Sequence, residues 1–324
     1  MINYTHMLEK IILFTLTANA DLTKRIADIL DSKIGKVEIT HFADGEVMAR
    51  SLDSVRGKSV YVIQSTSSPA SERIMELLLF IDGIRKANAK EINVVIPYYG
   101  YSRQDRIARP REPISARLVA DLLGTVGVSH LITLDLHTPQ IQGFFSCPVD
   151  NLSSIHLFAA YYVKKLKQMK IDPSEVVVVS PDHGSAHRGR DLATALPNSQ
   201  LAMVDKRRPS PDTAEVINIV GDVRDKTCII IDDIIDTGGT IIASAKQLYE
   251  NGAKNILVAA SHGVFSKNSV SELKAAGISD IVTTDSIEKN IPDVNVISIA
   301  EVLAEVITHN ELGTPLPPEY LAFY

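Results

Sequence analysis

The sequence predicts an α/β fold made of two homologous domains, each a mostly parallel sheet flanked by helices. Three observations lead to this prediction. Apolar, β-branched runs alternate with segments of helical periodicity along all 324 residues. The runs are continuous, as in strands buried on both faces, which favours parallel sheets covered by helices. The two halves of the chain also resemble each other in sequence, as duplicated domains do.

Eight runs are expected to be strands: Ile11–Leu16, Val60–Gln64, Asn93–Pro97, Leu131–Leu134, Val176–Val179, Cys228–Ile231, Ile256–Ala260 and Ile281–Thr283. A helix is expected over Ile241–Tyr249, with Gly252 just beyond its end as a cap. We expect an N-terminal domain over residues 1–150, a C-terminal domain over 151–307 and a proline-rich tail over 308–324.

The duplication rests on three pairs of segments that occur in the same order in both halves. They are Lys58–Ile63 with Lys226–Ile231, Asn88–Ile92 with Gly252–Ile256, and Leu131–Asp135 with Ile281–Asp285. The offset between partners changes from 168 to 150 residues (226 − 58 and 281 − 131), as loop-length differences would produce. The alternative is chance similarity between two series of βαβ units.

Composition and charge limit the classes of function. The chain has 33 Lys and Arg against 39 Asp and Glu, a net charge of −6, which argues against general binding to nucleic acid or acidic membranes. Its two cysteines form no CxxC and fit a reducing cytoplasm. The apolar run Ile11–Thr17 imitates a signal peptide, but Glu9 and Lys10 cancel in charge before it. We therefore expect a buried first strand and no membrane span.

The strongest chemical signal follows the strand expected at Cys228–Ile231. It comprises two adjacent carboxylates, a third carboxylate and a glycine turn that opens a helix: Asp232, Asp233, Asp236, Thr237, Gly238, Gly239 and Thr240. Such a turn and a helix N-terminus bind phosphate, and the acids suit a sugar diol and its metal ion. A sugar-phosphate site is therefore expected, against the alternative of a plain turn with solvated carboxylates. At the equivalent place the first half has Ser65–Pro69, without carboxylates or glycines.

Three further stretches are candidates for chemistry, each with a structural alternative. Tyr98–Arg106 is rich in Arg and Tyr and suits a polyanion, although many Arg-rich stretches are only solvated loops. His137 and Asp182 each follow an expected strand and suit a metal ion, although a lone His there is more often structural. Asp205–Pro211 has three consecutive cations before two prolines and is expected to be a mobile, exposed loop.

Together these motifs make the chain similar to the ribose-phosphate diphosphokinase family, over about Ile11 to Ile307. The resemblance implies phosphoribosyltransferase-like domains and transfer of the β,γ-diphosphoryl group of ATP to the 1-hydroxyl of ribose 5-phosphate, with release of AMP. It also implies a cytoplasmic enzyme that feeds nucleotide biosynthesis, uses Mg²⁺ and forms a homo-oligomer, a hexamer in the family. No nucleic acid or membrane partner is expected.

The resemblance also assigns roles to residues of this sequence. Lys206 and Arg208 match catalytic residues, and His137 and Asp182 match magnesium ligands. Residues that match ATP contacts are Phe42, Asp44, Gly45, Glu46, Arg103 and Gln104, the first four of them reaching the site of a neighbouring subunit. Residues that match ribose 5-phosphate contacts are Arg208, Asp232, Asp233, Asp236, Thr237, Gly238, Gly239 and Thr240.

Two other functions remain as alternatives. A phosphoribosyltransferase would share the sugar-phosphate loop but would have one such domain and a hood for a nucleobase. A non-enzymatic homologue would have a damaged loop or lack the Lys206 cation. The sequence departs from the family at Ser185 and Gly189 and in its tail, where Pro315, Pro317 and Pro318 and a lack of serines predict weak control by phosphate and ADP.

Overall fold

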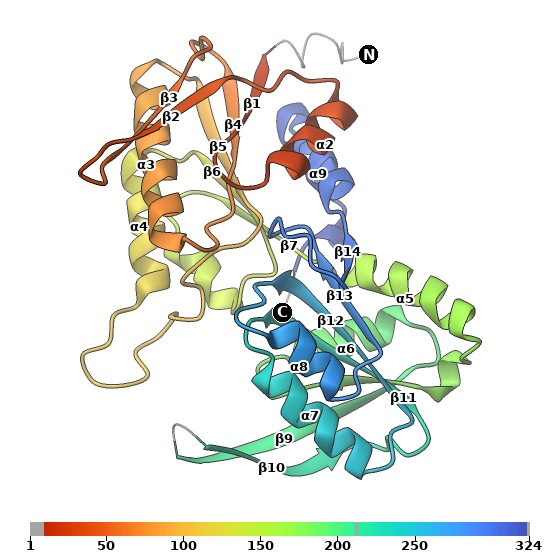
Figure 1. Ribbon diagram of the computed structural model, residues 1–324. Coiled ribbons are helices and arrows are strands. Elements are labelled where there is room, and N and C mark those ends of the chain that lie inside the picture. Colours follow the sequence, from red (N-terminus) through yellow and green to blue (C-terminus); the bar gives the residue numbers. More distant parts are fainter. Residues whose placement is uncertain (1–9, 211–212, 323–324) are drawn as a thin grey trace. The chain divides into compact units, whose positions relative to one another are not determined.

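The computed structural model describes residues 10–210 and 213–322, and of residues 206–217 it describes at most the backbone. The chain forms two compact units (Figure 1). Unit 1 comprises residues 10–153, 285–288 and 298–322, and unit 2 comprises residues 154–284 and 289–297. Both units are built from parallel strands and covering helices, which confirms the α/β fold predicted from the sequence.

Unit 1 contains a five-stranded sheet in which every neighbouring pair is parallel. In spatial order its strands are β1 (Ile11–Thr15), β4 (Ser59–Ile63), β5 (Glu91–Ile96), β6 (His130–Leu134) and β7 (Val149–Leu152). A separate antiparallel hairpin consists of β2 (Val37–His41) and β3 (Val47–Ser51). Because all strands of the sheet run the same way, the loops after them lie along one edge, where ligands bind in such folds.

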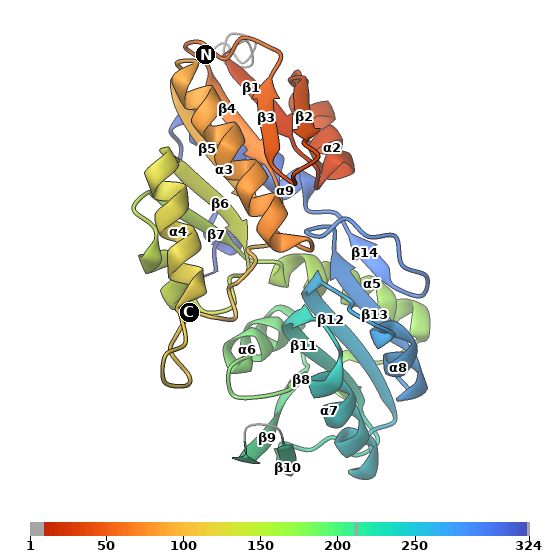
Figure 2. The same cartoon turned by 60° about the vertical axis from the view of Figure 1, so that its left-hand side comes forward.

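Helices cover both faces of this sheet. They are α2 (Ala20–Leu30), α3 (Ala70–Lys86), α4 (Ser115–Val126) and α9 (Ala300–Leu312), with short 3₁₀ turns η1 (Pro139–Phe144) and η3 (Pro318–Tyr320). Figure 2 shows α3 and α4 side by side on one face, where Val60 and Val62 of β4 share a core with Leu77 of α3. On the other face α2 packs on α9, and Tyr61, between the two valines, donates a hydrogen bond to Glu311 of α9. Side chains along β4 thus alternate between two apolar layers.

Unit 2 contains a seven-stranded sheet that is parallel except for one outer pair. In spatial order its strands are β10 (Thr213–Val220), β9 (Gln200–Ser210), β8 (Val176–Ser180), β11 (Thr227–Ile235), β12 (Asn255–Gly263), β13 (Asp280–Thr284) and β14 (Asn295–Ile297). The antiparallel pair is β9 with β10. The four strands β8, β11, β12 and β13 are buried on both faces, which explains their continuous apolar sequences.

The helices of unit 2 also cover two faces. They are α5 (Ile155–Met169), α6 (Ala186–Ala195), α7 (Gly239–Glu250) and α8 (Ser269–Ala275), with a 3₁₀ turn η2 (Pro173–Glu175). Cys228 and Ile230 of β11 pack with residues of α7 and α8, whereas Ile229 and Ile231 pack with residues of α5 and α6. The helix predicted over Ile241–Tyr249 is α7, and Gly252 follows it with a φ of +90°.

All eight strands predicted from the sequence are present, whereas β2, β3, β7, β9, β10 and β14 were not expected. The grouping of the C-terminal residues also differs from the expected division, because residues 298–322 belong to unit 1. The reason is local packing: Ser59 Oγ and Tyr61 Oη donate to Glu311 Oε1 at 2.6 and 2.8 Å, which holds the end of α9 on β4.

The expectation of an irregular loop at Asp205–Pro211 was wrong up to Ser210. The backbone of Asp205 pairs with that of Asn218, and Lys206 pairs with Val216, so β9 and β10 form a hairpin. Cations do not prevent this arrangement, because the hairpin lies at the edge of the sheet, where charged residues are common. In the described part of the chain no helix is both long and apolar enough to cross a membrane.

Candidate functional site

The two adjacent carboxylates of unit 2 lie within β11, not after it as the sequence suggested. Asp232 pairs with Ala260 of β12, and this pairing continues to Ile235, whereas the pairing of β11 with β8 ends at Ile230. The strand is longer than its apolar run because its neighbour β12 is equally long. Asp232 and Asp233 therefore extend beyond the carboxyl end of β8.

The glycine turn connects β11 to α7. Gly238 has a φ of +79°, a conformation that glycine adopts without strain, and α7 begins at Gly239. A Cβ atom on Gly238 would meet Leu273 at 3.3 Å, whereas a Cβ on Gly239 would have Thr237 Oγ1, at 3.9 Å, as its nearest neighbour. The space above Gly239 is thus open, and both Thr237 and Gly239 are exposed. The turn leaves room for a group the size of a phosphate beside backbone N–H groups.

A buried ion pair supports one of these carboxylates. Asp233 is 4% exposed and Arg188 of α6 is 3% exposed, and Arg188 Nη1 lies 4.0 Å from Asp233 Oδ1. The second carboxylate lacks such a partner: burial and the charge of Asp233 raise the pKa of Asp232 well above its usual range, while a hydrogen bond from Ser185 opposes the rise. Unit 2 therefore concentrates negative charge at this edge of its sheet.

Asp182 follows β8 as expected and lies close to the same carboxylates. Its Oδ1 accepts a hydrogen bond from the backbone N of Ser185 at 3.0 Å, and Ser180 Oγ donates to its backbone oxygen at 2.6 Å. Asp182 and Asp232 offer the hard oxygen ligands that Mg²⁺ prefers. Among the described residues no group of three or more His, Cys, Asp or Glu forms a closed metal site. A sparse set fits Mg²⁺, which keeps water and phosphate oxygens as ligands.

His137 belongs to unit 1, where it follows β6 and the buried Asp135, whose φ is +39°. The backbone N of Leu136 donates to Asn151 Oδ1 at 3.0 Å, which fixes this turn against β7. His137 itself is half-buried. The structure thus places it at the carboxyl edge of the sheet of unit 1, as expected from the sequence.

Arg103 and Gln104 lie in the loop after β5, and both are exposed. Gln104 is held in place, because its backbone oxygen accepts from Ala116 N at 3.1 Å and its side chain accepts from Ser115 Oγ. The nearby Tyr99 is 2% exposed and donates to the backbone oxygen of Ala116 at 2.8 Å. Tyr99 is therefore part of the core of unit 1.

Residues Phe42, Asp44, Gly45 and Glu46 form the tip of the β2–β3 hairpin. The turn is closed by the backbone N of Phe42, which donates to the oxygen of Glu46 at 2.8 Å, and Gly45 has a φ of +91°. Phe42 is 49% exposed, which is unusual for a large aromatic side chain. Asp44 and Glu46 are exposed beside it. The hairpin thus presents an aromatic ring and two carboxylates to solvent.

The loop of unit 1 that corresponds to the sugar-phosphate loop is filled by its own polar groups. Ser65 and Thr66 are buried, and Asn19 Oδ1 accepts from Ser65 N at 2.7 Å. Gly100 N donates to Thr66 Oγ1 at 2.6 Å, and a Cβ on Gly100 would come within 2.2 Å of the Thr66 oxygen. This loop therefore has no room for a phosphate at that point.

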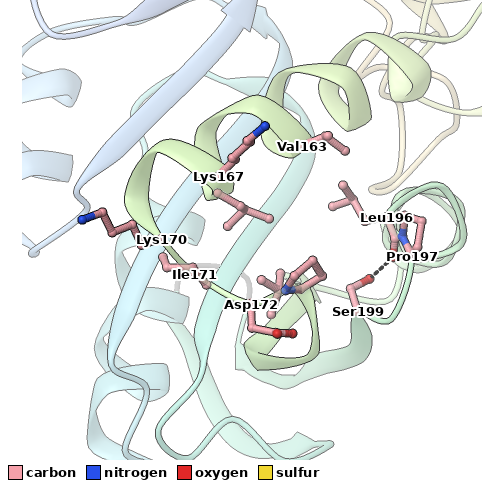
Figure 3. A pocket seen from close by; sticks show the side chains of 11 residues that line it. Val163, Lys167, Lys170, Ile171, Asp172, Leu196, Pro197 and Ser199 are labelled. Carbon is pink, nitrogen blue, oxygen red and sulfur yellow. Dashed lines mark hydrogen bonds between the residues drawn. The ribbon is translucent and has the colours of Figure 1, made fainter.

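An apolar cavity of about 470 Å³ lies elsewhere in unit 2 (Figure 3). Val163 and Leu166 of α5, Val176 of β8 and Leu196 line it. Val176 is the first residue of β8, so the cavity lies near the amino end of that strand, away from Asp182, which follows its carboxyl end. None of the predicted site residues whose side chains the structure describes lines this cavity.

Comparisons with known proteins agree with this arrangement. One family model, the N-terminal domain of ribose phosphate pyrophosphokinase, matches residues 11–127, and another, the phosphoribosyl synthetase-associated domain, matches residues 175–312. The ribose-phosphate pyrophosphokinase of Bacillus caldolyticus is 48% identical over 300 residues, which cover 91% of this chain and 93% of that protein. The chain belongs to the ribose-phosphate pyrophosphokinase family.

Other members of the family support the same assignment. Ribose-phosphate pyrophosphokinase 2 of Enterococcus faecalis is 45% identical over 310 residues and covers 94% of both chains. The crystal structure of phosphoribosylpyrophosphate synthetase from Mycobacterium smegmatis matches with a TM-score of 0.87 and 38% identity, covering 94% of this chain and 99% of that one. This member of the family is therefore an enzyme, as predicted from its motifs.

Sequence reasoning missed two residues that contact the predicted site residues. Arg188 pairs with Asp233, and Ser185 contacts both Asp182 and Asp232. Both belong to the stretch after β8, and Ser185 stood out only as a departure from the family. The side chains of Lys206 and Arg208 lie outside the described residues, and their backbone belongs to β9.

Proposed function

We propose that this enzyme holds ribose 5-phosphate on the carboxylates of β11 and the glycine turn while it transfers the β,γ-diphosphoryl group of ATP. One observation carries the proposal. Asp232 and Asp233 in β11 are followed within a few residues by a turn that has open space beside Gly239. Backbone N–H groups of the turn, with the positive end of α7, bind the 5-phosphate, with Asp236, Thr237, Gly238 and Thr240 around it. Asp232 and Asp233 accept hydrogen bonds from the ribose hydroxyls.

In the reaction, the 1-hydroxyl oxygen of ribose 5-phosphate attacks the β-phosphorus of ATP. A bond forms between that oxygen and the β-phosphorus, the bond to the α,β-bridging oxygen breaks, AMP leaves and the hydroxyl proton is released. The products are 5-phosphoribosyl 1-diphosphate and AMP. Lys206 and Arg208 stabilise the charge that develops on the β-phosphate oxygens and on AMP, and Arg208 also contacts the sugar phosphate.

ATP contacts come from unit 1. Arg103 suits a bidentate contact with phosphate oxygens, and the anchored Gln104 lies beside it. The hairpin tip with Phe42 contacts the adenine of ATP bound by a neighbouring copy, with Asp44 or Glu46 accepting from the exocyclic amino group. The exposed ring of Phe42 supports this role, and the role requires a homo-oligomer, for which we propose a hexamer.

His137 in unit 1 and Asp182 in unit 2 would each be a ligand of a Mg²⁺ ion. Bound there with the phosphates of ATP, Mg²⁺ would neutralise their negative charge and polarise the transferred group. The crowding of Asp182, Asp232 and Asp233 supports a divalent cation in unit 2, because their charges otherwise repel one another. We also propose the cytoplasm as the compartment, which fits Cys147 and Cys228, neither of which forms a disulfide.

The two other candidate functions lack support. A phosphoribosyltransferase needs one domain of this kind and a hood for a nucleobase, whereas this chain has two α/β units. A non-enzymatic homologue would have lost the sugar-phosphate loop, and here Asp232, Asp233 and the glycine turn are all present.

The decisive experiment mixes the enzyme with ATP and Mg²⁺, with and without ribose 5-phosphate. AMP is expected only when the sugar is present, and ³¹P NMR should show a diphosphate ester on the sugar. Formation of ADP and a sugar phosphomonoester would mean ordinary kinase chemistry and would contradict the proposal. A second assay offers phosphoribosyl diphosphate together with nicotinate or another base. Release of diphosphate in that assay would favour the phosphoribosyltransferase alternative.

A further inference from the structure

Ser185 occupies the position before the first residue of α6, where a serine normally caps the helix. In that role its hydroxyl would accept a hydrogen bond from a backbone N–H of the first turn. Here the side chain makes no capping hydrogen bond. Instead Ser185 Oγ donates to Asp232 Oδ1 at 2.7 Å. This hydrogen bond connects the loop after β8 to strand β11. The hydroxyl is thus committed to a carboxylate of the site.

The same residue also holds Asp182. The backbone N of Ser185 donates to Asp182 Oδ1 at 3.0 Å, and Ser185 Oγ lies 3.3 Å from that oxygen. Ser185 is 3% exposed, so these hydrogen bonds are shielded from water and are stronger than surface contacts. Asp232 Oδ1 additionally accepts from the backbone N of Asp233 at 3.0 Å. Both carboxylates are therefore held through their Oδ1 atoms.

These hydrogen bonds orient the carboxylate of Asp182. Among the described residues nothing donates a hydrogen bond to Asp182 Oδ2, which remains available to a ligand. Since Ser185 Oγ is 2.7 Å from one carboxylate oxygen and 3.3 Å from the other, those two oxygens lie no further apart than the sum of these distances. One small side chain thus lies between the carboxylates of Asp182 and Asp232 and contacts both.

We infer that Ser185 is a positioning residue that couples binding of Mg²⁺ at Asp182 to binding of ribose 5-phosphate at Asp232. The inference rests on the function proposed above and adds a coupling between two of its ligands. A hydrogen bond to a charged group is commonly worth about tenfold in an equilibrium constant. Coupling between two sites is reciprocal, so each ligand should strengthen binding of the other by the same factor.

Ser185→Ala is the test variant, because it removes the hydroxyl without removing a helix cap. Ser199→Ala is the matched control, because it removes a hydroxyl near the other end of α6. Ser199 Oγ donates to the backbone oxygens of Ala193 at 3.1 Å and Leu196 at 2.9 Å. Initial rates are measured at saturating ATP over a grid of free Mg²⁺ and ribose 5-phosphate concentrations. Calorimetric titration with ribose 5-phosphate, with and without Mg²⁺, measures the same coupling as a ratio of Kd values, and thermal unfolding shows whether each variant is folded.

In the wild type the KM for ribose 5-phosphate should fall as free Mg²⁺ rises. In Ser185→Ala the ratio of the KM values at low and high free Mg²⁺ should be about tenfold smaller than in the wild type. The kcat at saturation of both ligands should fall much less. Ser185→Thr, which keeps the hydroxyl, should restore the dependence, and Ser199→Ala should retain it. A Ser185→Ala enzyme with the wild-type dependence would overturn the inference, as would loss of kcat alone. If the wild-type enzyme needs neither Mg²⁺ nor ribose 5-phosphate, the proposed function itself fails.

Discussion

Arg188 and Asp233 form an ion pair at 4.0 Å with almost no contact with solvent. Removing one member of such a pair leaves an uncompensated buried charge, which commonly costs 3–5 kcal/mol. Arg188 therefore stabilises the buried carboxylate of Asp233 from within unit 2.

Arg188→Ala should lower the free energy of unfolding by roughly 3 kcal/mol. The reason is the isolated charge of Asp233, and chemical denaturation measures the loss. Arg190→Ala is the control, because Arg190 lies two residues further along α6 and is exposed. Equal stability of the two variants would show that the buried pair contributes nothing to the fold.

Gly239→Ala should leave stability unchanged and weaken ribose 5-phosphate binding, because its methyl group would enter the open space above the turn. Gly238→Ala should instead destabilise the protein by about 1 kcal/mol, since it forces an L-residue to a φ of +79°. Gly239→Val should weaken binding further. Calorimetric titration with ribose 5-phosphate and thermal unfolding separate the two effects. Tight binding by Gly239→Val would place the phosphate elsewhere.

Lys206→Ala and Arg208→Ala should each lower kcat by about a hundredfold, because loss of one electrostatic contact to the transition state commonly costs about 3 kcal/mol. Melting temperature should hardly change in either. Steady-state kinetics and thermal unfolding test this, with Lys226→Ala as the control, since the ammonium group of Lys226 donates to the backbone oxygen of Ser174. Normal turnover combined with a large fall in melting temperature would make these cations structural.

Inorganic phosphate should activate this enzyme little, and ADP should inhibit mainly by competing with ATP. The reason is the tail, where three prolines lack the N–H groups that an anion site would use. Glu311 accepts hydrogen bonds from Ser59 and Tyr61, which hold its carboxylate against β4. Initial rates at varied ATP and fixed ADP decide the matter. Inhibition that persists at saturating ATP would contradict the expectation.

Much of the fold could be predicted because the central strands are buried on both faces. Val176–Val179 and Cys228–Ile231 are continuous apolar runs for that reason, and β8 and β11 occur there. The two hairpins escaped prediction because their strands mix polar and apolar residues. In β2, Val37 and Ile39 alternate with Glu38 and Thr40, a weak period-two signal in a strand of only five residues.

The candidate site was predictable where its residues are consecutive. Asp232 to Thr240 form one string, and the turn at Gly238 has the conformation that its glycine suggests. Contacts between separate strands were not predictable in the same way. Nothing in the sequence indicates that the hydroxyl of Ser185 donates to Asp232 instead of capping the N-terminus of α6. Which partner it bonds depends on the spacing of β8 and β11.

The filled loop of unit 1 determines how many sugars the enzyme takes up. Asn19 and Gly100 already satisfy Ser65 and Thr66, and no open space remains beside Gly100. The chain contains two α/β units, but we expect only unit 2 to bind ribose 5-phosphate. Ribose 5-phosphate should therefore bind with a stoichiometry of one per chain, so that a hexamer would take up six molecules rather than twelve. We expect unit 1 to bind ATP in place of a second ribose 5-phosphate.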